Sequence, residues 1–191
     1  MLSGAFIFLI ETAFGLFTIA LLLRFYLQCV RASYRNPLAE FLNAITDFAV
    51  RPARRVIPGL WGLDLATLVL AWLAQFVEIL LVIQVKGLQP GSAIANALLG
   101  LTLLALLLLA KLGLYIIMVA VVIQAVLSWI NPYSPVAPLL NAMTRPFLRV
   151  FQRLIPPVGN VDLSPLFVII ACQLLLMVPV AYLEMSLSRL L

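Results

Sequence analysis

Four long apolar blocks constrain this chain more than any other feature of its sequence, and they run over residues 5–30, 65–85, 94–130 and 163–183. Of the 191 residues, 65% are hydrophobic and only 10% are charged, which exceeds what the core of a water-soluble domain requires. The hydrocarbon core of a bilayer takes about 20 residues of α-helix to cross. We therefore predict an all-α membrane protein with four transmembrane helices, over about 5–30, 64–86, 101–130 and 162–185.

The third apolar block is too long for one crossing. Its 37 residues form about 55 Å of straight helix, which is too short for two crossings and a turn. We expect the part around residues 91–100 either to lie on the outer surface or to extend the helix beyond the membrane.

The segment between the first two blocks recurs between the last two. Residues 43–58 read NAITDFAVRPARRVIP, and residues 141–156 read NAMTRPFLRVFQRLIP. Over residues 36–75 and 134–173, which are 98 positions apart, 14 of 40 residues are identical. This pattern predicts a duplicated unit of helix, basic loop and helix, over 1–90 and 91–191. Two crossings per unit give both copies the same orientation, whereas inverted repeats need an odd number.

Arginines gather in the two long loops. Residues 31–58 hold five of them and residues 131–160 hold three, while the link over 86–93 holds only Lys86. The positive-inside rule then predicts that both loops are cytoplasmic and both termini lie outside. A basic balance is also found in nucleic-acid-binding proteins, but here the loop arginines alternate with large apolar residues, so a nucleic-acid partner is not favoured.

Each basic loop separates polar from apolar residues at helical spacing, over 36–58 and 134–156. This pattern predicts an amphipathic helix in the membrane interface, with its arginines facing water and lipid phosphates. The candidate lipid-binding or partner-binding residues are Arg51, Arg54, Arg55, Arg145, Arg149 and Arg153. Thr46 and Thr144 are predicted N-caps, because Pro146 suits the first turn of a helix.

Asp64 and Asp162 stand just before the second and fourth apolar blocks. One interpretation is that each carboxylate caps a transmembrane helix at the positive end of its dipole. The other is that each pairs with a loop arginine and holds the interfacial helix against the membrane helix. The sequence leaves both interpretations open.

Several ionisable and polar residues fall at membrane depth. Glu11 and Lys111 occupy equivalent positions in the two repeats. We therefore predict either that they approach each other across the pseudo-twofold axis that relates the repeats, or that each extends to water. A second set lies deeper, where it either lines a permeation path or joins helices by hydrogen bonds: Arg24, Gln75, Glu78, Gln124 and Gln173.

The residue inventory offers no catalytic, metal or cofactor constellation. The chain has no histidine, and its two cysteines, Cys29 and Cys172, belong to no CxxC pair. It also lacks a phosphate-binding Gly-rich loop and a pair of carboxylates at matching depth. We predict that it is not an enzyme and binds no cofactor.

Each copy contains, in order, an NP or SP pair, a threonine, two arginines followed by IP, and a DL pair, and each is joined to hydrophobic helices. Together the two copies resemble the YggT (YlmG-like) family of integral membrane proteins. The second copy is closer to the family pattern, since the first has Phe48 in place of Pro146 and Ala66-Thr67 in place of Ser164-Pro165. The resemblance implies a non-enzymatic protein of the bacterial plasma (inner) membrane. Bacterial members are linked to osmotic-stress tolerance and to cell division or envelope organisation, and chloroplast relatives to cytochrome b6 assembly and nucleoid distribution.

Two functional hypotheses follow. The first is a membrane organiser or assembly factor whose arginine-bearing helices bind anionic lipid headgroups and another membrane protein. The second is an ion channel or transport-related protein in osmotic adaptation, which requires a homo-oligomer because four helices are few for a pore.

Overall fold

The computed structural model describes residues 2–32, 36–59, 62–87, 94–131, 134–154 and 162–188, and these ranges are helical over most of their length. The helices are α1 (Leu2–Cys29), α2 (Pro37–Val56), α3 (Leu65–Lys86), α4 (Ile94–Ile130), α5 (Ala137–Leu154), α6 (Ser164–Leu175), the π-helix η1 (Leu176–Val180) and α7 (Ala181–Ser188). Four stretches are long and apolar enough to cross a membrane: α1, α3, α4 and the continuous run from α6 to α7. The predicted all-α fold with four membrane helices is confirmed.

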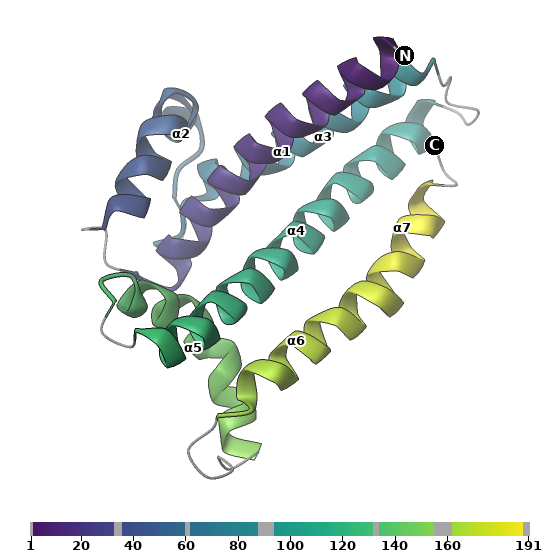
Figure 1. The fold of residues 1–191 in the computed structure, drawn as a ribbon. Coiled ribbons are helices and arrows are strands. Elements are labelled where there is room, and N and C mark those ends of the chain that lie inside the picture. The colour runs from purple at the N-terminus through teal and green to yellow at the C-terminus, as the bar shows by residue number, and fades with distance from the viewer. Residues whose placement is uncertain are drawn as a thin grey trace.

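The long helices lie side by side in a row (Figure 1). α1 and α3 pack closely, α4 packs on α3, and α6 with α7 packs on α4. Helices α2 and α5 lie beside the same ends of the long helices, which we call one end of the row. The N and C marks in Figure 1 lie beside the opposite ends. The order of long helix, short helix and long helix therefore occurs twice with the same direction, as expected for a tandem repeat.

The third membrane helix, α4, is one continuous helix of 37 residues. Of the two expectations for this block, the described part from Ile94 onward agrees with a helix that extends beyond the membrane. Residues 91–93 lie outside the described ranges. An unbroken α-helix satisfies its own backbone hydrogen bonds, so a long apolar run without proline has no reason to end early.

The prediction that Thr46 and Thr144 are N-caps is wrong, because both residues lie inside helices. α2 begins about nine residues earlier, where the side chain of Asn36 accepts a 2.8 Å hydrogen bond from the Ala39 amide. Both threonines are fully buried, and each hydroxyl donates to the carbonyl four residues before it, at 2.6 Å for Thr46 and 2.9 Å for Thr144. Pro146 therefore lies in the interior of α5 rather than in its first turn.

The fourth membrane helix changes its winding near Pro179, which lies inside η1. Proline has no amide proton and its ring crowds the preceding turn, and a π-helical turn is one of the ways in which a helix accommodates this. The helix continues as α7 without a break in the chain direction.

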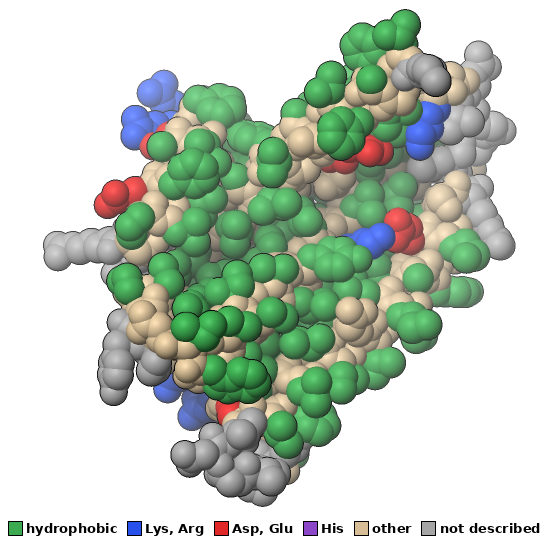
Figure 2. Space-filling model, viewed as in Figure 1, with side chains coloured by type: hydrophobic (Ala, Val, Ile, Leu, Met, Phe, Trp, Pro, Cys, Tyr) green, Lys and Arg blue, Asp and Glu red, His purple; other side chains and the backbone are tan. Residues whose placement is uncertain are grey.

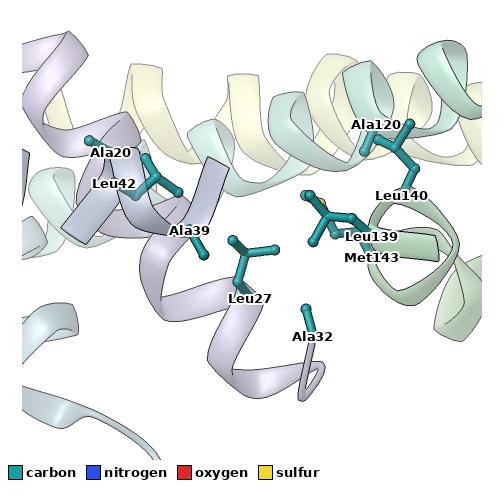
Figure 3. Close-up of a cluster of buried hydrophobic side chains, with 9 residues drawn as sticks. All are labelled: Ala20, Leu27, Ala32, Ala39, Leu42, Ala120, Leu139, Leu140 and Met143. Carbon is teal, nitrogen blue, oxygen red and sulfur yellow. The ribbon is translucent and has the colours of Figure 1, made fainter. Parts of the chain in front are cut away.

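One buried cluster joins the two repeats at the end where α2 and α5 lie. Leu27 of α1 and Leu42 of α2 share it with Ala120 of α4 and Met143 of α5 (Figure 3). The Tyr26 hydroxyl of α1 adds a hydrogen bond to the backbone carbonyl of Met143. The two short helices are therefore held on one common core.

Candidate functional site

The arginine-bearing helices α2 and α5 form the candidate site. Each helix buries one row of side chains, which includes Leu42 and Val50 in α2 and Met143 and Leu148 in α5. The six candidate arginines of the two helices are all exposed. Figure 2 shows that hydrophobic side chains cover most of the long helices on the visible face, while charged side chains lie toward the two ends. The candidate site therefore consists of two short helices with exposed arginines, next to long helices with a largely hydrophobic surface.

Arg24 fixes α2 to α1. Its side chain is 8% exposed, and its guanidinium donates to the Thr46 hydroxyl at 2.7 Å and to the Asp47 carboxylate at 2.8 Å. Asp47 also pairs with Arg51, one turn further along α2, at 2.7 Å. The hydrogen bond from Arg24, reinforced by Arg51, holds the pKa of Asp47 below its usual value. Arg24 is therefore a structural anchor of α2, and sequence reasoning did not identify Asp47 as its partner.

Asp64 has both of the roles that the sequence left open. Its carboxylate accepts from the backbone amide of Thr67 and so caps α3. The same carboxylate accepts hydrogen bonds from Arg54, including one at 3.0 Å from Nε, and this links the C-terminal turn of α2 to the start of α3. Burial raises the pKa of Asp64, but the hydrogen bonds from Arg54 and Thr67 outweigh it, so the pKa is lowered.

Asp162 makes the corresponding link in the second repeat with a neutral partner. It accepts from the Ser164 amide at 2.9 Å and from the Gln152 side chain at 2.8 Å. Gln152 stands 98 positions after Arg54, as Asp162 does after Asp64. The two links are therefore equivalent in position, but only the first is an ion pair.

The anchor made by Arg24 has no equivalent in the second repeat. Gln124 occupies the matching position, and Arg145 stands where the first repeat has Asp47. The Gln124 side-chain oxygen is buried and has no hydrogen-bond partner in the described chain. It lines a cavity of about 500 Å³ between α4, α5 and α6, together with Gln152 and Asp162.

Lys111 pairs with Glu184 of α7 at 2.6 Å, so the structure corrects the predicted approach to Glu11. Sequence reasoning did not consider Glu184, although 22 residues after Asp162 it reaches the same depth as Lys111. The positions equivalent to Lys111 and Glu184 in the first repeat are Glu11 and Lys86, with the signs exchanged. Glu11, Lys86 and Glu184 line one cavity of about 690 Å³.

The described contacts do not join the other polar membrane residues into one seam. Gln75 donates to Glu78 on its own helix at 3.1 Å, and both line the cavity near the chain ends. Arg24 bonds to α2 instead, and Gln173 is exposed on the outer side of α6. In the described ranges, no three Cys, Asp or Glu side chains gather as a metal site would require.

Comparison with known proteins finds one family that matches most of the chain. The CCB3/YggT family model matches residues 3–85 and 103–183. An uncharacterized protein of Pseudomonas aeruginosa is 38% identical over 176 residues, which cover 91% of this chain and 87% of the relative. The uncharacterized protein YggT of Escherichia coli K12 is 32% identical over 164 residues, 85% of this chain and 82% of its own length. No solved structure matches the chain.

Proposed function

The chain belongs to the CCB3/YggT family, and we propose that it is a non-enzymatic protein of the bacterial inner membrane whose arginine-bearing helices bind anionic lipid headgroups. In this role it serves as an organiser or assembly factor for the membrane, the envelope or the division machinery. The positive-inside rule places α2 and α5 on the cytoplasmic face and both termini outside.

The position of the six exposed arginines is the observation that carries this proposal. They lie on α2 and α5, which sit together at one end of the row of membrane helices. Exposed apolar side chains accompany them, among them Phe41 and Phe48 of α2 and Val150 of α5. A helix with both kinds of side chain lies favourably where the acyl chains meet the headgroups.

Charge that is not used inside the protein supports the same proposal. Arg145, Arg149 and Arg153 make no ion pair with any described residue, whereas Arg54 is used to hold Asp64. Each unpaired arginine near an anionic leaflet contributes about 1 kcal/mol of attraction. α5 is therefore the principal lipid-binding element, and α2 is the more firmly fixed of the two helices.

The test is lipid selectivity of the protein in phosphatidylcholine vesicles that contain spin-labelled phosphatidylglycerol or spin-labelled phosphatidylcholine as a probe. We expect the wild-type protein to prefer the phosphatidylglycerol probe, and added salt to weaken this preference. Replacing Arg145, Arg149 and Arg153 by Gln removes the preference, while Lys86→Gln at the opposite end of the molecule leaves it intact. An equal association of both probes with the wild-type protein contradicts the proposal.

A second candidate function, an oligomeric ion channel, draws on the cavity near the chain ends. It brings Gln75 and Glu78 of α3 together with Glu184 of α7. Ion flux into liposomes that contain the purified protein separates the two functions. Flux that is lost in a Glu78→Ala variant favours the channel, and the absence of flux together with arginine-dependent lipid selectivity favours the organiser.

A further inference from the structure

The two repeats pack on each other in the membrane through α3 of the first and α4 of the second, and we call this contact the inter-repeat interface. The Trp72 indole of α3 donates to the Thr102 carbonyl of α4 at 3.4 Å. Ala71 of α3 and Leu109 of α4 belong to one buried cluster. Gln75, on the next turn of α3, is 7% exposed. The second helix of one repeat is therefore covered by the first helix of the next.

Each side of the inter-repeat interface has an uncovered counterpart at an edge of the molecule. Ile170 and Gln173 of α6 stand 98 positions after Trp72 and Gln75, and both are exposed. Two α1 residues that lie 100 positions before buried α4 residues are also exposed. Ala5 corresponds to Ala105 and Leu9 to Leu109, and both α1 residues are exposed.

These two surfaces lie at opposite edges of the row of helices (Figure 1). α6 and α7 pack on α4, and α1 packs chiefly on α3, so neither edge covers the other within one chain. The two outer surfaces of the row therefore carry several of the positions that form the contact between the repeats, although Ile169, the counterpart of Ala71, packs inside its own repeat.

Gln173 gives the α6 surface a physical reason to be covered. It stands nine residues after Ser164, or about 13.5 Å along the helix, which is close to the centre of a bilayer of about 30 Å. No described residue hydrogen bonds to its amide. Hydrocarbon offers no hydrogen-bond partner, so polar side chains at this depth face other helices. Its counterpart Gln75 does so inside the chain.

We propose that a second copy of this chain covers both surfaces, with α6 of one copy packed on α1 of the other in the way that α3 packs on α4. Two copies related by a twofold axis along the membrane normal make this contact twice and close a ring of four repeats. A second copy is the occupant because its exposed surface is the counterpart of one that already fits. This proposal does not depend on lipid binding by the arginines.

Disulfide cross-linking in native membranes tests the arrangement. The contact of Trp72 with Thr102 corresponds to a contact of Ile170 with Leu2 of the second copy. In the full chain with Cys29→Ser and Cys172→Ala, a copy with Leu2→Cys is co-expressed with a differently tagged copy that carries Ile170→Cys. We expect a disulfide-linked dimer that contains both tags.

The matched control pairs Phe6→Cys with Leu175→Cys in the same background. Both residues are exposed, but their counterparts Leu106 and Val77 are also exposed, so the proposed ring leaves them outside the contact. A cross-link between positions 2 and 170 but not between 6 and 175 supports the proposal. No cross-link for either pair, or equal yields for both, overturns it.

A second measurement keeps the test independent of oxidation chemistry. Gln173→Leu is expected to weaken self-association in vesicles about fivefold, since an interhelical hydrogen bond in a membrane contributes about 1 kcal/mol. Gln173→Asn retains the amide and is expected to retain most of the association. Wild-type association in the Gln173→Leu variant, measured by energy transfer between labelled copies, contradicts a role for this amide in the contact.

Discussion

Arg24 of α1 donates a 2.8 Å hydrogen bond to Asp47 of α2. This pair joins the membrane helix α1 to the arginine-bearing helix α2. The second repeat has Gln124 and Arg145 at the equivalent positions, so it lacks the pair. Instead, α5 is held by packing, by the Gln152 side chain, which donates to Asp162, and by the Tyr26 hydroxyl of α1, which donates to the Met143 carbonyl. The duplicated helices are therefore alike in position and different in attachment, with more free charge on α5.

Asp47→Ala is expected to destabilise the protein strongly. The variant leaves the buried Arg24 guanidinium with only a hydroxyl partner, and the loss of a hydrogen bond to a charged group costs about 1.5–3 kcal/mol. Thermal unfolding of the purified protein measures the effect. Arg51→Ala is the control, because its side chain is 77% exposed and its loss costs less than about 0.5 kcal/mol. Equal effects of the two variants contradict the anchoring role of Arg24.

Asp64→Ala is expected to free the C-terminal turn of α2 more than Asp162→Ala frees that of α5. Asp64 is 5% exposed and is paired with charged Arg54, whereas Asp162 is exposed and is paired with neutral Gln152. Hydrogen exchange over the two turns measures the difference. Arg54→Gln copies the second repeat into the first and is expected to have an intermediate effect. If Asp162→Ala accelerated hydrogen exchange in α5 more than Asp64→Ala accelerated it in α2, this ranking would be contradicted.

Acid is expected to weaken the attachment of α2. The pKa values of Asp47 and Asp64 are lowered in the folded protein, so both carboxylates bind protons less readily when folded than when unfolded. Their contribution to stability is fully present at pH values above the unfolded pKa of about 3.9 and is lost as the pH falls below it. The melting temperature therefore drops on acidification below about pH 4. In an Asp47→Asn, Asp64→Asn double variant, the curve between about pH 5 and pH 3 is flatter, and an unchanged slope contradicts this assignment.

Exchanging the charges of Lys111 and Glu184 is expected to restore the stability that either single change removes. The two side chains are 2.6 Å apart and partly exposed, so their coupling is about 1 kcal/mol. Lys111→Glu and Glu184→Lys are measured singly and together by thermal unfolding. The control combines Lys111→Glu with Glu11→Lys, and rescue in this combination instead would show that Glu11 is the true partner.

The four membrane helices were predictable, because length and apolar composition decide them, and the common orientation of the two repeats followed from the duplication with two crossings in each copy. Which side chains meet was less predictable, since the rotation of each helix depends on packing against its neighbours. Lys111 therefore pairs with Glu184 rather than with Glu11, and Arg24 pairs with Asp47. Thr46 was misassigned because its hydroxyl bonds to a carbonyl inside the helix, which leaves no signal distinct from that of a cap. Asn36-Pro37 carried the true start signal for α2.

We infer that the two repeats lie the same way up, with both arginine-bearing helices on the cytoplasmic surface. Labelling of single cysteines with a membrane-impermeant maleimide tests it most directly, in a background with Cys29→Ser and Cys172→Ala. Arg51→Cys reports on α2 and Arg149→Cys on α5, since both positions are exposed. We expect both positions to be labelled in inverted membrane vesicles and neither to be labelled in intact spheroplasts. Labelling of the two positions from opposite sides, or of either from the outside, contradicts it.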